Sequence, residues 1–287
     1  MKAKPEQRRA ASQKPDAHEI HLANSLAWNL TLPYYEAKAA RALPLLRAGK
    51  VFLHPIEQRL LRSRLPAQTV VHLQCAGGVE TLSLVNAGAS HVIGIDIAES
   101  LIGCARRLGE QLNAPAEWLV ADVLDPPRSL RSCADGIYTG QGALPWVHDL
   151  AAWARAVAAI LRPDGWLVLF DLHPCSVMFD EDAQELSSTG VTYFAPLLRW
   201  SRWTGAYIGS LQDSAALKQS KKVARVWPPS AVISALLDAG LNVNGFGEYP
   251  DAYWDAFPAL QPADRRKVPC TYSVTATKPA GSGHAGG

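Results

Sequence analysis

The sequence predicts an α/β domain with a doubly wound, mostly parallel sheet. Apolar segments of strand length alternate with segments of helical period between residues 69 and 172. The run from 166 to 172 is continuously apolar, which is typical of a parallel strand covered on both faces. A small-residue turn follows the first strand and an acidic residue ends the second, as in a nucleotide-binding βαβ unit. Parallel strands need crossover connections, and the intervening helices supply them.

The first 65 residues precede this alternation. Residues 1–17 are polar with two prolines and predict a disordered tail. Residues 18–65 predict a helical extension, because leucines recur at four-residue spacing; Tyr34 and Tyr35 could make it a lid or could simply pack the helix down. The helices expected there are His21–Ala48, interrupted at Pro33, and Ile56–Leu65.

Residues 66–279 predict the α/β domain itself, and residues 280–287 a flexible glycine-rich tail. The expected strands are Thr69–Leu73, His91–Ile97, Glu117–Ala121, Gly136–Thr139 and Trp166–Leu172. The expected helices between them are Glu80–Ala87, Glu99–Leu112 and Asp149–Leu161, with a turn at 163–165. The alternation breaks at Pro174, and residues 175–226 predict an aromatic-rich insertion after strand five. It resumes with a helix at Pro229–Ala239 and two β-rich segments, Leu241–Tyr249 and Cys270–Thr277.

Composition limits the class of protein and its partners. Hydrophobic residues at 48% and charged residues at 19% are typical of a soluble globular protein. A net charge of +2 does not favour a nucleic acid as partner. Five cysteines without a CxxC pair favour a reducing compartment. No apolar run is long enough to span a membrane, so we expect a cytoplasmic protein without a membrane partner.

A ligand site is expected at the carboxyl ends of the strands, where open α/β sheets bind ligands. The small residues after strand one let the backbone approach a ligand closely. Asp96 ends strand two and could accept both hydroxyls of a ribose; Asp122 ends strand three and could accept an adenine amino group. Either acid alone could be a helix N-cap. Two acids at successive strand ends, after a small-residue loop, favour a binding site.

Five segments resemble successive motifs of class I S-adenosylmethionine (SAM)-dependent methyltransferases: VVHLQCAGGVETL, VIGIDIAESLIGCAR, WLVAD, YTGQGALPW and LLRPDGWLVLFDLHP. They are similar in particular to a bacterial small-molecule subgroup whose first motif has the form L-H-L-Q-C. The resemblance implies a Rossmann-like sheet of the class I methyltransferase type, SAM as cofactor and a small-molecule acceptor. The cofactor residues that it implies are Gln74, Cys75, Ala76, Gly78, Asp96, Ile97, Asp122, Val123, Thr139 and Gly140.

The resemblance also divides these residues among the parts of SAM. Residues 74–78 would surround the methionine part, Asp96 the ribose and Asp122 the adenine, with residues 139–140 near the sulfonium. The chain departs from the family at three positions. It has His72 where the family has an acid, and Gln74 and Ala76 where the family has glycines.

Catalytic and acceptor residues are less strongly indicated. His173 follows strand five and could act as a general base, although local hydrogen bonding that shapes the loop is slightly favoured. Four rings are candidates for the acceptor site, Tyr35, Trp146, Tyr193 and Trp203. They could stabilise a sulfonium, or could equally form the core of the lid and insertion. His18 and His21 lie three apart, but in a polar segment, so no metal site is expected.

The leading hypothesis is in-line methyl transfer from SAM to a small molecule. One alternative is attack at another sulfonium carbon, by cyclisation or aminocarboxypropyl transfer, which releases methylthioadenosine. The other is a non-catalytic SAM-binding module, which the altered glycine loop would favour. A dehydrogenase is disfavoured because Gln74 and Ala76 do not supply the three-glycine turn that a pyrophosphate needs.

Overall fold

The structure is a computed structural model that describes residues 17–194, 198–200, 215–220 and 222–280. The predicted tails therefore lie outside the described residues, except Ala17, which begins a helix, and residue 280. Trp203 also lies outside them. In the described part, no helix is both long and apolar enough to cross a membrane.

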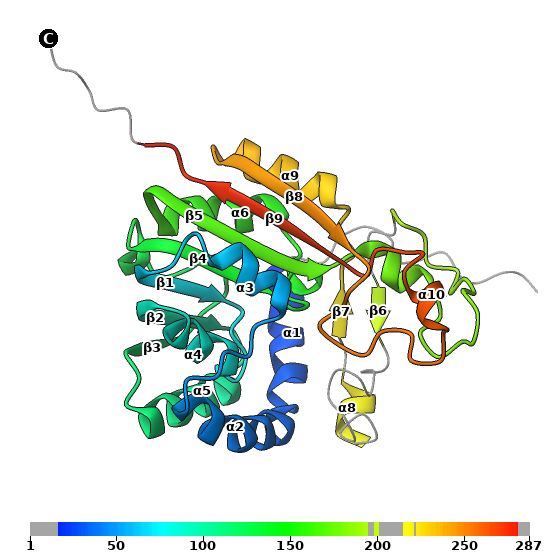
Figure 1. Cartoon of the computed structure of the whole chain (residues 1–287), viewed down its shortest axis with the longest axis horizontal. Coiled ribbons are helices and arrows are strands. Elements are labelled where there is room, and N and C mark those ends of the chain that lie inside the picture. The colour runs from blue at the N-terminus through cyan, green and yellow to red at the C-terminus, as the bar shows by residue number, and fades with distance from the viewer. Residues whose placement is uncertain (1–16, 195–197, 201–214, 221, 281–287) are drawn as a thin grey trace, which may run out of the picture.

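A seven-stranded sheet runs through the molecule in the order β3-β2-β1-β4-β5-β9-β8 (Figure 1). Its strands are β1 Ala67–Leu73, β2 Ala89–Asp96, β3 Ala116–Val120, β4 Ala134–Gly140, β5 Leu161–Leu172, β8 Asn242–Tyr249 and β9 Thr271–Thr277. The first five are parallel, and β9 runs antiparallel to both β5 and β8. The chain reverses its direction of winding between β1 and β4, which places the switch point there. The predicted α/β Rossmann-like fold is confirmed.

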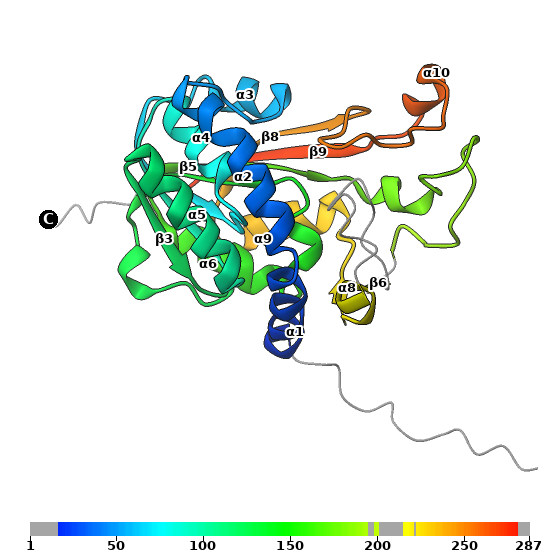
Figure 2. The ribbon, with the colours of Figure 1, turned by 90° about the horizontal axis from the view of Figure 1, so that it is seen from below.

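Helices cover both faces of this sheet, as a doubly wound architecture requires (Figure 2). Alternate strand residues such as Val71, Ile95 and Ile137 face α6 (Leu150–Ile160) and α9 (Pro229–Asp238). The opposite face is covered by α2, α3, α4 and α5, which pack in two further clusters of apolar residues. Their bounds are Leu32–Arg47, Pro55–Leu61, Val79–Asn86 and Glu99–Leu112.

The N-terminal extension contains two helices before α3. α1 spans Ala17–Asn29 and α2 begins at Leu32, so the predicted interruption at Pro33 separates two helices. Proline is tolerated in the first turn of α2, where its missing N–H has no helical partner. α3 is shorter than predicted and begins with a capping box, in which the His54 amide donates to Glu57 Oε2 at 2.6 Å.

β5 begins five residues earlier than predicted, and the predicted turn is an irregularity within it. The pairing with β4 shifts between Leu161 and Trp166, and Asp164 has a φ of +62°. The Asp164 amide donates to the Lys278 carbonyl at 3.0 Å, which holds this bulge against the chain after β9.

A second lobe lies beyond the carboxyl end of β5 (Figure 1, right). It contains the short helices η3 (Pro174–Met178), α8 (Ala215–Gln219) and α10 (Pro262–Arg265), and the paired strands β6 (Leu198–Trp200) and β7 (Lys222–Ala224). Phe257, Leu260 and Cys270 form a small core with Phe179 and Leu186. The insertion therefore shares a core with the connection between β8 and β9, which the sequence did not indicate.

Candidate functional site

A cavity lies at the carboxyl ends of β1 to β4. We call it the first cavity. It brings together most of the predicted cofactor residues with two of the predicted acceptor-site rings. The predicted residues that line it are Gln74, Ala76, Asp96, Ile97, Asp122, Val123, Gly140, Tyr35 and Trp146.

The loop after β1 turns through left-handed backbone conformations. Gln74, Ala76 and Gly78 have φ values of +58°, +45° and +82°. Glycine adopts such values without steric cost, whereas other residues rarely do. This explains why glycines would suit the first two positions, and it shows that the turn forms with side chains present. Gly78 lines neither of the cavities described here; a Cβ on it would lie 2.7 Å from Ala105 and Trp118.

Asp96 ties this loop to the one after β2. Its side chain accepts hydrogen bonds from the amides of Ala76 and Ala98, both at 2.9 Å. Asp96 is 9% exposed, and burial raises the pKa of its carboxyl despite these bonds. Because α5 is capped by Ala98, Asp96 is not the N-cap residue of that helix. A carboxylate has about four acceptor sites, so Asp96 keeps acceptor capacity toward the cavity.

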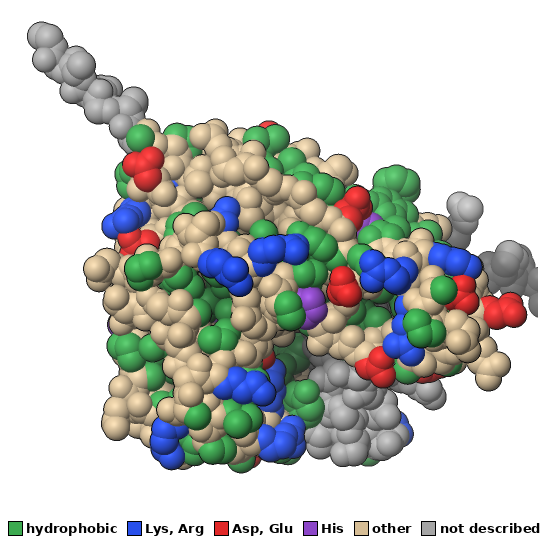
Figure 3. Space-filling model, viewed as in Figure 1, with side chains coloured by type: hydrophobic (Ala, Val, Ile, Leu, Met, Phe, Trp, Pro, Cys, Tyr) green, Lys and Arg blue, Asp and Glu red, His purple; other side chains and the backbone are tan. Residues whose placement is uncertain are grey.

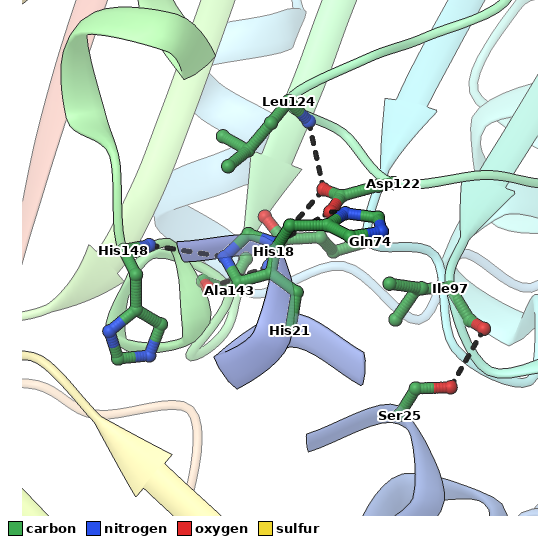
Figure 4. Close-up of polar contacts among 9 residues, drawn as sticks. All are labelled: His18, His21, Ser25, Gln74, Ile97, Asp122, Leu124, Ala143 and His148. Carbon is green, nitrogen blue, oxygen red and sulfur yellow. Dashed lines mark hydrogen bonds and ion pairs between the residues drawn. The ribbon is translucent and has the colours of Figure 1, made fainter. Parts of the chain in front are cut away.

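Asp122 is held by donors from two directions (Figure 4). Its Oδ1 accepts from the Leu124 amide at 3.0 Å, and His21 Nδ1 lies 2.9 and 3.0 Å from the two carboxylate oxygens. His18 Nδ1 is 3.4 Å from Oδ2. Burial opposes ionisation, but the hydrogen bonds from His21 and Leu124 outweigh it and lower the pKa of Asp122.

Both histidines come from α1, which crosses the carboxyl ends of the strands (Figures 1 and 4). His21 Nε2 accepts from the His148 amide at 3.2 Å, so Nδ1 carries the proton that is donated to Asp122. Ser25 Oγ donates to the Ile97 carbonyl at 3.0 Å. Asn24 pairs with both backbone groups of Val223 in β7. These contacts bind α1 to the loops after β2, β3 and β4.

The sequence did not identify α1 as part of the site. The expected leucine stripe is exposed, with Leu22, Leu26 and Leu30 at 57%, 66% and 41%. The buried face instead carries polar and aromatic residues at spacings of three and four. Those lining the first cavity are His21, Asn24 and Trp28. This spacing was the available signal, because side chains three and four apart share one face of a helix.

A second cavity adjoins the first. We define it by His72, Cys75, Tyr138, Tyr253 and Trp254, together with residues from α2 and α4. Five residues line both cavities, and they mark the junction: Tyr35, Gln74, Ala76, Gly140 and Gln141. Cys75, a predicted cofactor residue, faces only the second cavity.

Three other predicted residues, all described, line neither cavity. Thr139 is fully buried in β4. His173 is 2% exposed; its Nδ1 accepts from the Cys175 amide at 3.1 Å, and its Nε2 lies 3.0 Å from Glu248. The bond from the Cys175 amide is the local, loop-shaping contact expected of His173 if it is not a general base. Tyr193 lies beside His173, with ring centroids 6.2 Å apart, and Trp203 is outside the described residues.

Comparison with known proteins identifies the domain that contains the loops after β1, β2 and β3. Residues 70–165 match the family model described as a methyltransferase domain. Residues 70–165 therefore belong to a SAM-dependent methyltransferase domain. This methyltransferase domain extends from β1 into β5 and contains Asp96, Asp122 and the loop between Gln74 and Gly78. SAM is the methyl donor of the class.

Curated relatives of the methyltransferase domain include the ubiquinone biosynthesis O-methyltransferase of Bordetella pertussis. That protein is 29% identical over 166 residues, which cover 57% of this chain and 65% of the relative. The match thus spans just under two thirds of the relative's length.

Solved structures share the fold. A SAM-dependent methyltransferase from Mesorhizobium loti superposes with a TM-score of 0.54 at 22% identity, covering 77% of this chain and 96% of that one. One from Methanosarcina mazei gives 0.56 at 17% identity, covering 79% and 99%.

Proposed function

We propose that this chain is an enzyme that transfers a methyl group from SAM to a small-molecule acceptor. The observation that carries the proposal is the convergence of Asp96, Asp122 and the left-handed Gln74–Ala76 turn on one cavity, inside a methyltransferase domain. We place the chain in the bacterial small-molecule subgroup with an L-H-L-Q-C first motif.

The first cavity has polar groups that fit SAM. The Oε1 atom of Gln74 is buried and has no hydrogen-bond partner among the described residues. Gln74 Nε2 donates to the Ala143 carbonyl at 2.8 Å, so the amide is held with Oε1 free to accept from the ammonium group of a methionine. Buried polar atoms are seldom left unpaired, so this oxygen indicates a ligand donor. Asp96 would hold the ribose hydroxyls and Asp122 the adenine amino group.

Bound SAM supplies an electrophilic methyl group. The chain's contribution is to bind, to orient and to exclude water. Three rings serve this purpose, because Trp28 packs against Trp146 and Tyr35 with centroids 5.1 and 6.5 Å apart, and all three line the first cavity. Aromatic faces attract a cation, so they favour a sulfonium over a neutral thioether. No proton transfer is assigned to His173, whose two ring nitrogens already have partners.

Two further observations support a small acceptor. The relative from Bordetella pertussis is a ubiquinone biosynthesis O-methyltransferase, a name that indicates a small-molecule acceptor. On the face seen in Figure 3, basic and acidic side chains are interspersed and form no single basic band of the kind that a nucleic acid would need.

Calorimetric titration with SAM tests the binding step. Asp96→Asn should raise the Kd at least about tenfold, because a hydrogen bond to a charged group contributes about 1.5–3 kcal/mol. Asp238→Ala, an exposed acid at the end of α9, is the matched control and should leave the Kd unchanged. Equal affinities for all three proteins would refute the assignment of the site.

Product analysis tests the reaction. The protein is incubated with methyl-labelled SAM and a small-molecule extract, and the products are identified by mass spectrometry. Methyl transfer should give S-adenosylhomocysteine and a labelled small molecule in equal amounts. Methylthioadenosine would show that another sulfonium carbon is attacked. SAM that binds but is never consumed would indicate the non-catalytic module.

A further inference from the structure

The second cavity is joined to the first at residues with left-handed backbone conformations. Three non-glycine residues with positive φ lie at the junction: Gln74 at +58°, Ala76 at +45° and Gln141 at +56°. Strained backbone persists where the surrounding structure fixes it, and such positions cluster at functional sites. A molecule in the second cavity would therefore lie next to a ligand in the first, across residues held in defined positions.

A buried carboxylate next to the second cavity contacts one of the residues that line it. Glu57 of α3 is fully buried, and Tyr138, which lines the cavity, donates its hydroxyl to Glu57 Oε1 at 2.5 Å. Gln141, from the junction, donates to Oε2 at 2.9 Å. The His54 amide donates to the same oxygen. Only this last bond is needed to cap α3, so the capping box does not explain the contacts with Tyr138 and Gln141.

The other charged groups near Glu57 are already paired. Lys38 of α2 and Glu80 of α4 form an ion pair at 2.6 Å, and both line the second cavity. His72 of β1 hydrogen-bonds to Thr81 at 2.7 Å, and burial lowers its pKa to about 4, so it is neutral. Burial, with a smaller contribution from Glu80, raises the pKa of Glu57 to about 7. Near neutral pH, Glu57 can therefore both hold and release a proton.

Aromatic side chains form part of the remaining walls of this cavity. Tyr34 and Tyr35 meet edge to face with centroids 5.3 Å apart, and Tyr253 and Trp254 lie 4.7 Å apart. Such walls suit a flat, apolar ring, while the polar end at Tyr138 and Gln141 suits a hydroxyl group on that ring.

We propose that the second cavity binds a phenolic acceptor and that Tyr138 removes its hydroxyl proton, with Glu57 as the positioning residue that takes the proton of Tyr138. This inference rests on the proposed function. The acceptor O–H bond breaks and its proton moves to Tyr138 Oη, while the proton of Tyr138 moves to Glu57 Oε1. The acceptor oxygen bonds to the methyl carbon as the carbon–sulfur bond breaks, and the sulfur keeps the electron pair.

Tyr138 acts as a relay in this exchange. The net movement of the proton is from the acceptor hydroxyl to Glu57, because Tyr138 gains one proton as it gives up another. Burial and the charge of Glu57 raise the pKa of Tyr138 well above its usual value. Tyr138 therefore stays protonated, and it can accept a proton only as it gives its own to Glu57. The rate should fall as the pH drops through about 7, because protonated Glu57 accepts no proton.

The test uses phenol as acceptor, with toluene and aniline as comparison ligands lacking the hydroxyl. Wild type, Tyr138→Phe, Glu57→Gln and the control Tyr249→Phe are compared; Tyr249 bonds to Ser273 outside the cavity. With S-adenosylhomocysteine bound, phenol should bind more tightly than toluene, and Tyr138→Phe should remove the difference. With SAM, anisole should form, and Glu57→Gln should lower kcat by at least about tenfold. In Glu57→Gln, the Kd for SAM should stay within about twofold of the wild-type value, and the fall in rate at low pH should be lost.

An infrared measurement gives a readout that does not depend on turnover. The carbonyl band of protonated Glu57, recorded on either side of the pKa of about 7, should shift when phenol binds and be absent from Glu57→Gln. Four results would overturn the inference: a band unmoved by phenol, methylation of aniline but not phenol, no methylation of phenol while SAM binds, or an unchanged pH profile in Glu57→Gln. Failure of SAM to bind at all would instead refute the proposed function.

Discussion

Replacing His18 and His21 by alanine should change the affinity for SAM in opposite directions. Both side chains come from α1 and both contact the carboxylate of Asp122. The side chain of His18 is 73% exposed and lies 3.4 Å from Oδ2, where an adenine amino group would donate. That of His21 is 5% exposed and bonded on both ring nitrogens. A bound adenine should therefore displace His18 and leave His21 in place.

The sizes of the two effects follow from burial. A contact made by an exposed side chain such as His18 contributes about 0.2–1 kcal/mol, so removing this competitor should tighten SAM binding by up to about fivefold. A buried hydrogen bond to a carboxylate contributes about 1.5–3 kcal/mol. Losing His21 leaves Asp122 without its principal donor and opens the wall of the first cavity, so SAM should bind about 10- to 100-fold more weakly.

Calorimetric titration of SAM at constant pH and salt measures both effects. Leu22→Ala, on the outer face of α1, is the matched control and should bind SAM as the wild type does. Thermal unfolding without ligand separates loss of affinity from loss of fold. The reasoning would be refuted if His18→Ala weakened binding as His21→Ala does, or if His21→Ala bound SAM with wild-type affinity.

Three further predictions concern the fold around the site. Because burial raises the pKa of Glu57 from 4.5 to about 7, its contribution to stability is fully present below pH 4.5 and is lost as the pH rises to about 7. The loss is about 3 kcal/mol, and urea denaturation across this range should show it in wild type but not in Glu57→Gln. Asp171→Ala removes the carboxylate that accepts from the Gly142 and Leu144 amides, at 3.0 and 2.8 Å, in the loop after β4. This variant should lower the free energy of unfolding by about 3 kcal/mol and should weaken SAM binding. An unchanged free energy of unfolding and an unchanged Kd would contradict the role of this loop. Gly140→Ala would place a Cβ 2.3 Å from the Phe170 carbonyl oxygen and should prevent stable folding, whereas Gly103→Ala, with only Arg107 at 3.6 Å, should stabilise α5 by about 0.5–1 kcal/mol in thermal unfolding.

The parts of the fold and site that sequence predicted depend on local pattern. Strand and helix periods are set by neighbouring residues, and the strand-end rule then places Asp96 and Asp122 at one edge. The antiparallel pairing of β9 was not predicted, because an apolar strand has the same sequence pattern in parallel and in antiparallel pairing.

The remaining site residues depend on contacts between distant parts of the chain. His21 meets Asp122 across 101 positions, and Glu57 meets Tyr138 across 81. The sequence around Glu57 is typical of an ordinary first helical turn, so it does not predict that this side chain is buried. His173 also has a distant partner: the sequence slightly favoured local hydrogen bonding over a general base, and Glu248, 75 positions away, lies at its second ring nitrogen.

The central claim, that the first cavity binds SAM, is tested most directly by thermal denaturation with excess SAM and with NAD as control. A ligand that binds only the folded state at a hundredfold excess over its Kd stabilises it by about 2.7 kcal/mol. For a domain of this size, the Tm should rise by roughly 5–10 °C with SAM. NAD should cause no change. An unchanged Tm with SAM, or an equal rise with NAD, would contradict the account.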